Sequence, residues 1–452
     1  MQSDRQSAGV SGAYAIVTCL FFAWGFITSL NDPLVASVKG IFHLTDVEAQ
    51  LTAFAFFIAY GVMSLPGAVI LARLKSVPTV LLSLGLMVAG CLIMLVAVRL
   101  AFYPLILLGL FVLASGITLL QVAANPLAAA LGTPQRSHFR LTFSQAFNSF
   151  GTFIGPILGA HLFLRGIEIK KGAVVTGAAK ATALAGIDRA YFWIAGLIIL
   201  IALMMFAARR LISAAAPPPP HEAADLGIGA TIREALSSRW ALFGGLAIFL
   251  YVGAEVAIGT QMALFLNSDL IWGRSDALFD LPFVTWVVPQ DGVLGLSLEQ
   301  AGKATALYWG GAMIGRFAGS ALLTRVPAPQ LLTVFTGIAS ALCLFVFGVG
   351  GVPAGWAALS IGLFNSIMFP VIFTITLERS SASEEATSGF LCFSIVGGAV
   401  LPLIVGLVSE HTSYVTAFIV PALCYAVLFL FAIASRRART HLRGDPTVAT
   451  VH

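Results

Sequence analysis

The chain has 452 residues, of which 59% are hydrophobic and only 10% are charged. Soluble globular proteins average about 45–50% apolar and about 25% charged residues, so this composition excludes an ordinary soluble domain and indicates a membrane protein with many spans. The formal net charge is +5. Because the basic residues mark the edges of apolar segments and are not interleaved with exposed aromatic residues, we expect no nucleic-acid partner.

Twelve apolar segments are each long enough to cross a bilayer, which takes about 20 helical residues. We expect them near residues 13–38, 47–73, 77–100, 102–132, 141–164, 189–211, 241–267, 299–324, 329–350, 353–377, 386–409 and 414–435. This series predicts an all-α membrane protein embedded in a lipid bilayer. The residues before the first segment lack a signal-peptide pattern, so we expect this segment to start translocation itself.

The basic residues predict how the chain lies in the membrane, because Lys and Arg collect in loops that stay cytoplasmic. If the N-terminus is inside, the larger share of them falls on the cytoplasmic side, including Arg73, Arg325 and Arg436. We therefore expect a multi-pass protein of the plasma membrane, the inner membrane in bacteria, with both termini in the cytoplasm. All five cysteines lie inside apolar segments and are interpreted as small core residues, neither disulfides nor metal ligands.

The middle of the chain interrupts the series of apolar segments. Four consecutive prolines, beginning at Pro217, cannot be helical and favour an extended spacer. We predict an N-terminal six-helix half over residues 1–211, a cytoplasmic linker over 212–239 and a C-terminal six-helix half over 240–452. The stretches 66–74 and 318–326 share Gly, Leu and Arg at one offset, which indicates an internal repeat. Two parallel six-helix halves are typical of the major facilitator architecture.

Asp32 follows Asn31 in a segment, residues 13–37, that carries no other charge. An ionised carboxylate at bilayer depth costs about 3 kcal/mol or more, so such residues are rare and usually functional. We interpret Asp32 as a group that binds and releases a proton. The alternative is that Asp32 lies near the watery end of its helix and only caps it.

Four amide side chains lie in the fourth and fifth segments. Gln121 and Asn125 are four residues apart and Gln145 and Asn148 are three apart, so each pair shares one helix face. Polar side chains inside a membrane bundle turn toward other helices or a wet cavity. Amides both donate and accept hydrogen bonds, which suits a ligand covered with hydroxyl groups. These residues are therefore candidates for binding a neutral sugar, with hydrogen bonding between helices as the alternative.

Glu255, Gln261 and Asn365 lie inside predicted helices of the second half and complete the candidate binding site. Glu255 is expected to contact the ligand, to bind a second proton, or to pair with Arg316, which lies well inside the eighth segment and needs a counter-ion or carbonyl groups. Motifs for catalytic metals, phosphate loops and nucleophilic triads are missing from the sequence. We therefore expect no enzyme, no catalytic residue, no metal and no cofactor.

Six stretches of the chain resemble the fucose–galactose–glucose:proton symporter family of the major facilitator superfamily. They are FFAWGFITSLND at 21–32, LASGITLLQVAANP at 113–126, LTFSQAFNSFG at 141–151, YVGAEV at 251–256, YWGGAMIGRF at 308–317 and GLFNSIMFP at 362–370. These stretches cover six predicted helices and both halves. The joint match is therefore much more specific than any single motif.

The resemblance implies twelve helices, alternating access and sugar uptake driven by a cation. Fucose permeases of the family have a glutamate where this chain has Gln121, whereas the glucose/galactose branch has glutamine, so the resemblance favours that branch. Pro33, directly after Asp32, departs from the family pattern and is expected to kink the first helix. The stretch 268–297 is longer than the pattern, and the sequence predicts no role for it.

We therefore expect a secondary active transporter, a monomer, that imports a neutral hexose, glucose or galactose, by proton symport. Asp32 would couple the proton to the sugar through a shared conformational equilibrium. The expected sugar-binding residues are Asn31, Gln121, Asn125, Gln145, Asn148, Glu255, Gln261 and Asn365. The alternatives are a permease for N-acetylglucosamine or another sugar, a sodium-coupled sugar transporter, and a membrane sugar sensor without transport.

Overall fold

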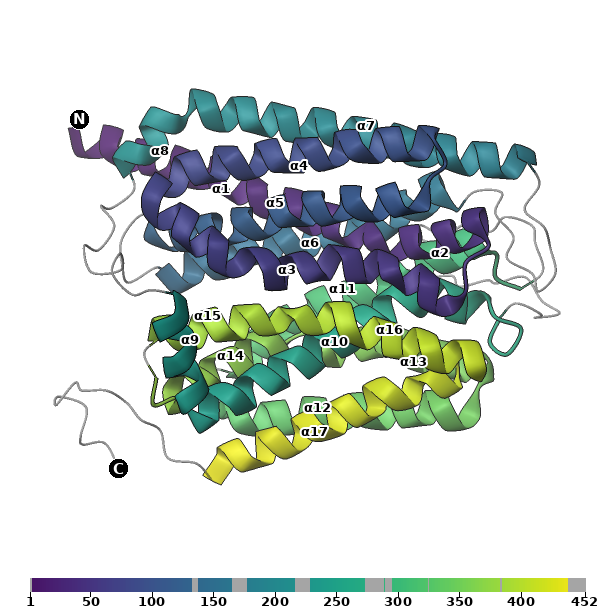
Figure 1. Cartoon of the computed structure of the whole chain (residues 1–452). Helices are drawn as coiled ribbons and strands as arrows, with labels where there is room; N and C mark the ends of the chain where they lie inside the picture. The colour runs from purple at the N-terminus through teal and green to yellow at the C-terminus, as the bar shows by residue number, and fades with distance from the viewer. Residues whose placement is uncertain are drawn as a thin grey trace.

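The computed structural model describes residues 2–131, 137–164, 177–215, 228–272, 288, 295–323, 325–382 and 384–437. Figure 1 shows two helical bundles side by side. The N-terminal half contains α1 (Gln2–Ser29), α2 (Asn31–Phe42), α3 (Asp46–Leu74), α4 (Ser76–Arg99), α5 (Tyr103–Ala130), α6 (Ser137–Phe163), α7 (Gly177–Ala207) and α8 (Arg209–Ala215). The C-terminal half contains α9 (Ile228–Ser237), α10 (Arg239–Asn267), α11 (Leu298–Leu323), α12 (Ala328–Val349), α13 (Gly351–Asn365), α14 (Met368–Arg379), α15 (Glu384–Phe393), η2 (Ser394–Val396), α16 (Gly397–His411), η3 (Thr416–Phe418) and α17 (Ile419–Arg437).

Ten helical segments of the described chain are long and apolar enough to cross a membrane, and they match ten of the predicted spans. The predicted spans 141–164 and 299–324 are filled by α6 and α11, which have 27 and 26 residues. These two helices carry more polar residues and pack against each other between the halves. The twelve-helix expectation is therefore met, with the two most polar spans placed where the halves meet. Helices suit a bilayer because they satisfy every backbone polar group internally.

The predicted boundaries differ from the structure at the sixth span. The sixth span, expected over 189–211, corresponds to α7, which begins at Gly177. The four prolines of the predicted linker lie outside the described residues, and the helix that follows them, α9, packs against α15 and α10. The domain limits at 211 and 239 stay a prediction. Most of the stretch 268–297 also lies outside the described residues.

Prolines interrupt two of the spans close to the polar residues of the candidate site. The first span breaks at Leu30, between α1 and α2, which confirms the kink expected from Pro33. Pro33 has no N–H to donate to the carbonyl of Ser29 four residues earlier. In the tenth span, Pro370 likewise cannot donate to the carbonyl of Ser366, and α13 ends at Asn365. Both breaks free a backbone carbonyl in the interior of the bundle.

Close helix contacts depend on glycine at a few positions. On α4, a Cβ added at Gly90 would lie 2.6 Å from the Cα of Leu113 on α5. On α6, a Cβ added at Gly151 would lie 2.7 Å from the backbone nitrogen of Phe26 on α1. Small residues let membrane helices approach closely, so these glycines bring α6, with its amides, directly against α1.

In the described part of the chain the two halves meet mainly where α3 packs on α16, α6 on α11 and α2 on α10, and α3 also contacts α15, η2 and α10. The start of α1 and the end of α17 lie at the same end of the bundle, on the left of Figure 1. The short connection between α2 and α3 lies at the opposite end. The first half of the chain and the second half therefore face each other across a single long interface.

Candidate functional site

Asp32 lies at the interface between the two halves. It occupies the first turn of α2, is 6% exposed, and accepts a hydrogen bond of 2.6 Å at Oδ2 from the indole Nε1 of Trp309 on α11. A Cβ added at Gly259 on α10 would lie 3.4 Å from both carboxylate oxygens. Three helices from both halves thus enclose this carboxylate. Asp32 is buried and caps no helix end through its side chain, so the capping alternative does not describe it.

Asn31 is the other polar residue at this break. Its side chain is 3% exposed, and neither its Nδ2 nor its Oδ1 has a hydrogen-bond partner within the described part of the chain. Leaving a buried polar group unpaired costs about 1–3 kcal/mol, so buried amides are nearly always bonded. Asn31 therefore offers a donor and an acceptor next to the Asp32 carboxylate.

The amides predicted on α5 and α6 do meet. Gln145 donates from Nε2 to Oδ1 of Asn125 at 3.4 Å, and Asn148 donates from Nδ2 to the carbonyl oxygen of Phe21 on α1 at 3.2 Å. Gln121 donates from Nε2 to the hydroxyl of Tyr60 on α3 at 2.9 Å. Each amide thus joins its helix to another one, as the helix-contact alternative expected. All four are half-buried, so part of each side chain remains accessible to a ligand.

A second set of polar side chains lies in the C-terminal half. Glu255 on α10 accepts a hydrogen bond of 2.7 Å at Oε1 from the hydroxyl of Tyr251 one turn earlier. The hydroxyl of Tyr308 donates to the backbone oxygen of Glu255 at 3.2 Å and accepts from Nδ2 of Asn365 at 2.6 Å. Hydrogen bonds through Tyr308 of α11 thus link Glu255 of α10 to Asn365 of α13. Trp309, the donor to Asp32, is the next residue after Tyr308, with ring centroids 5.1 Å apart.

Arg316 on α11 connects the halves. It donates from Nη1 to the Ser149 hydroxyl of α6 at 2.6 Å and from Nε to the Ser366 carbonyl at 3.4 Å. That carbonyl is the one freed by Pro370. A hydroxyl and a carbonyl group are thus partners of Arg316, and its pairing with Glu255 stays a prediction.

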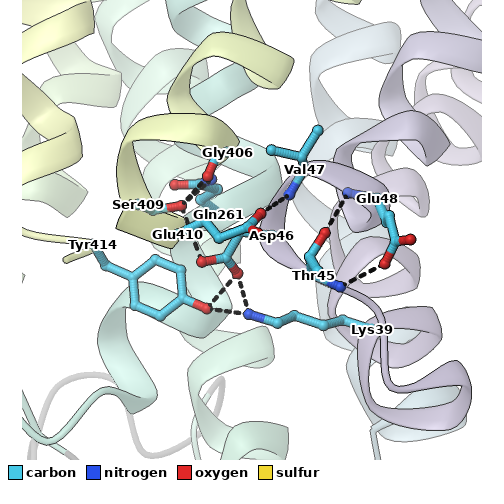
Figure 2. A network of polar contacts seen from close by, with 10 residues as sticks. All are labelled: Lys39, Thr45, Asp46, Val47, Glu48, Gln261, Gly406, Ser409, Glu410 and Tyr414. Carbon is cyan, nitrogen blue, oxygen red and sulfur yellow. Dashed lines mark hydrogen bonds and ion pairs between the residues drawn. The ribbon is translucent and has the colours of Figure 1, made fainter. Parts of the chain in front are cut away.

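Gln261 belongs to a different group of contacts from the other predicted binding residues. Its Nε2 donates to the Ser409 hydroxyl of α16 at 3.2 Å, and Ser409 donates in turn to Oδ2 of Asp46 at 3.2 Å. Oδ1 of Asp46 accepts from the Tyr414 hydroxyl at 2.8 Å and pairs with Lys39. Figure 2 shows these side chains converging from both halves. We call Lys39, Asp46, Gln261, Ser409 and Tyr414 the inter-half network.

The inter-half network lies at the end of the bundle that holds the α2–α3 connection. Other contacts between the halves accompany it: the backbone nitrogen of Val47 donates to Glu410 at 3.3 Å, and Thr260 donates to Gln50 at 3.0 Å. On α6 and α11, His161 lies 3.2 Å from Glu299. The two halves are therefore closed against each other at this end.

The sequence named Trp309 only as an aromatic residue able to stack on a sugar ring, and it missed both the bond of Trp309 to Asp32 and most of the inter-half network. Trp309 stands in a stretch that was noted for its resemblance, but a tryptophan in an apolar helix reads as ordinary packing. Asp46 follows Thr45 and precedes Glu48, and the structure has the full capping box there. An acidic residue is common in the first turn of a helix, so the sequence gives no further reason to single out Asp46. Its contacts with Ser409 and Tyr414 are visible only in the structure.

The described residues hold no group of three or more His, Cys, Asp or Glu that is able to bind a metal ion. All five cysteines are free.

Comparisons with known proteins agree with this geometry. Residues 14–389 match the family model of the Major Facilitator Superfamily. The chain is 35% identical over 426 residues to the glucose/galactose transporter of Brucella abortus biovar 1 (strain 9-941), with 94% of each chain covered. It is 30% identical over 448 residues to the L-fucose-proton symporter of Escherichia coli (strain K12), again with 94% of each covered. The crystal structure of the transporter FucP in the outward conformation superposes with a TM-score of 0.66 at 27% identity, covering 93% of this chain and 98% of that one.

The fold, with polar side chains enclosed between two helical halves, defines a multi-pass membrane protein of a transporter class, not an enzyme. The chain belongs to the Major Facilitator Superfamily, and within it to the fucose–galactose–glucose:proton symporter family that the sequence resembled. The expected fold class is thereby confirmed.

Proposed function

We propose that this protein is a symporter that carries a neutral hexose, glucose or galactose, together with a proton. The relatives named above supply the substrate class, since they are a glucose/galactose transporter and a fucose-proton symporter. The observation that carries the proposal is the buried Asp32 carboxylate, which is held between helices of both halves. A group in that position gains or loses its partner whenever the halves move. Its protonation is therefore linked to conformation.

The polar residues around Asp32 suit a ligand rich in hydroxyl groups. Asn31 presents an unpaired donor and acceptor beside the carboxylate. The amides of α5 and α6 can exchange their present hydrogen bonds for bonds to a sugar, because each amide both donates and accepts. In the C-terminal half, Asn365 and Glu255 are linked through Tyr308 and offer a second set of polar contacts. We assign the sugar to the space between these two sets, where it would contact both halves.

The end of the bundle at which the two halves are closed supports a transport cycle with alternating access. We assign the α2–α3 end to the extracytoplasmic side, since the basic residues favour cytoplasmic termini and the start of α1 and the end of α17 lie at the other end. In this orientation the structure is a state closed to the outside. Opening requires the contacts of the inter-half network to break. A proton gradient directed into the cell would make import the direction of transport.

The experiment is uptake of labelled sugar into proteoliposomes that contain the purified protein. Glucose, galactose, fucose and N-acetylglucosamine are compared under an imposed pH gradient, an imposed sodium gradient and no gradient. Accumulation of glucose or galactose driven by the pH gradient supports the proposal. A sodium-driven signal, a preference for N-acetylglucosamine, or binding without accumulation would each replace it by one of the alternatives.

The coupling role of Asp32 has a matched control. Asp32→Asn removes the titratable group and is expected to abolish uphill accumulation while exchange of sugar across the membrane persists. Asp188→Asn removes an acid that pairs with Arg99 at 3.2 Å on the rim of the N-terminal half. This control is expected to accumulate sugar like the wild type. Wild-type accumulation by Asp32→Asn would refute the coupling role.

A further inference from the structure

The contact between Trp309 and Asp32 joins the two halves through a single hydrogen bond. Trp309 belongs to α11 in the C-terminal half and Asp32 to α2 in the N-terminal half. Asp32 is buried and Trp309 is half-buried, and the 2.6 Å separation is short, as bonds to a charged acceptor are. Gly259 of α10 leaves room for this approach, since an added Cβ would lie 3.1 Å from the indole ring.

The chemistry of the donor gives this bond a preferred protonation state. An indole N–H donates and cannot accept, and it does not titrate. A carboxylate accepts such a bond about twice as strongly as a neutral acceptor does. Trp309 therefore stabilises Asp32 in its ionised form, and it does so only in a conformation where α11 and α2 are in contact.

We propose that Trp309 is the positioning residue for Asp32: its indole N–H holds the ionised carboxylate while the halves are closed at the end of the inter-half network, and releases it when they open there. The inference rests on the proposed role of Asp32 as the coupling group. In the closed state the Asp32 O–H bond breaks and the proton passes to water, while the indole N–H bond stays intact. In the open state the carboxylate loses its donor and takes up a proton from water.

Two other features near α2 act against this effect. Burial in the closed state disfavours ionised Asp32. Glu255 stands one helical turn before Gly259, which borders Asp32, and an anion there would also disfavour the ionised form. Among the described residues, several charged groups near this interface have partners of their own: Lys39 pairs with Asp46, His161 and Lys303 pair with Glu299, and Arg316 donates to Ser149 and Ser366.

The linkage predicts how Trp309 changes the pH dependence of closure. Burial in the closed state disfavours ionised Asp32, whereas the Trp309 bond favours it in that same state. Removing the bond must therefore make closure less favourable at high pH than it is in the parent protein. A hydrogen bond to a charged group is strong enough to change the closed-to-open ratio about tenfold to hundredfold. Replacing Trp309 by Phe keeps an aromatic ring in place and removes the donor.

The test measures closure without any sugar. Gln50→Cys, one helical turn deeper than Asp46, places a thiol among buried contacts between the halves. It is introduced into a variant whose five native cysteines are replaced by Ala. The rate of labelling by a membrane-impermeant charged thiol reagent is recorded from pH 5 to pH 9, and is corrected for the thiolate fraction with a free cysteine peptide. Every variant also carries His161→Gln, because protonation of His161 beside Glu299 would favour closure at low pH.

Each variant is described by the ratio of its labelling rate at pH 9 to its rate at pH 5. Trp309→Phe is expected to raise this ratio by about tenfold or more relative to the parent protein, whereas Trp356→Phe, whose ring packs against Trp272 at 5.5 Å within the C-terminal half, is expected to leave it unchanged. Trp309→Gln, which retains an N–H donor and does not titrate, is expected to bring the ratio part of the way back and guards against a purely steric effect of Phe.

The variants distinguish the proposed coupling role of Asp32 from the proposed positioning role of Trp309. If Asp32→Asn keeps the pH dependence, Asp32 is not the coupling group and the proposed function fails. If Asp32→Asn abolishes the pH dependence but Trp309→Phe leaves it unchanged, the coupling group stands and the role of Trp309 is refuted. If Asp32→Asn abolishes the pH dependence, Trp309→Phe raises the ratio of the labelling rate at pH 9 to that at pH 5, and the Trp356→Phe control leaves this ratio unchanged, the inference is supported.

Discussion

The inter-half network gives the sharpest prediction about the transport cycle, through the variant Tyr414→Phe. The Tyr414 hydroxyl donates to Asp46 at 2.8 Å and accepts from Lys39 at 2.6 Å. Tyr414 belongs to the connection after α16 in the C-terminal half, whereas the other two residues belong to α2 and α3 (Figure 2). Phe keeps the ring and removes only the hydroxyl that links the halves. The variant is therefore expected to weaken closure and leave each half folded.

The size of the effect follows from the contacts that are lost. A hydrogen bond to a charged group contributes about 1.5–3 kcal/mol, which corresponds to roughly a tenfold to hundredfold change in the closed-to-open ratio. Ser409 still donates to Asp46 in the variant, so closure is weakened and not abolished. Asp46→Asn would be a poorer test, because Lys39 would keep its charge without its partner, and removing one member of a buried pair costs about 3–5 kcal/mol.

The pH range of this effect is set by the phenol. Burial, and then the charge of Asp46, raise the pKa of Tyr414 well above its usual value. A tyrosine whose pKa is raised by its folded environment stays protonated below about pH 10, where it is also protonated when unfolded. The hydroxyl therefore donates to Asp46 throughout the range from pH 5 to pH 9. The difference between Tyr414→Phe and the parent protein is expected to be the same at both ends of that range.

The assay is thiol labelling at Gln50→Cys in the cysteine-free variant, from the side assigned as extracytoplasmic. Tyr414→Phe is expected to accelerate labelling about tenfold or more. Tyr103→Phe is the matched control, since the Tyr103 hydroxyl donates to the Glu48 carbonyl at 2.7 Å and lies 3.0 Å from Thr52, all within the N-terminal half. Equal labelling rates in Tyr414→Phe and the parent protein, or equal acceleration in both tyrosine variants, would refute the reasoning.

Two further predictions concern packing and the sugar branch. Gly186→Ala places a Cβ against a backbone carbonyl of α6 and is expected to cost about 1–3 kcal/mol, measured as a lower melting temperature in detergent, whereas Gly196→Ala on the same helix, with open space around it, should leave that temperature unchanged. Gln121→Glu adds a second ionisable group beside Tyr60 in the same half as Asp32. It is expected to shift the pH optimum of uptake upward and to change the preference among glucose, galactose and fucose, and an unchanged pH profile with unchanged selectivity would exclude position 121 from the site.

The sequence by itself determined the class, the number of helices and the main polar positions. Charge is so costly in a bilayer that Asp32 stands out in an apolar span without any structure. Helix periodicity placed Gln121 with Asn125 and Gln145 with Asn148, and the structure joins these two faces through Gln145 and Asn125. Pro33 predicted the break in the first helix, because a proline lacks the N–H that would bond to the carbonyl one turn earlier. All of these effects are local along the chain.

Only the tertiary structure decided which polar residues act together. Gln261 lies six residues from Glu255 on one helix, yet it contacts Ser409 and joins the inter-half network. Trp309 meets Asp32 from a helix 277 residues away in sequence. Such pairings depend on how two helical halves dock, and docking is set by the summed packing of many apolar side chains and glycines. No short pattern encodes that sum, so the partner of a buried charge becomes visible only when both halves are in place.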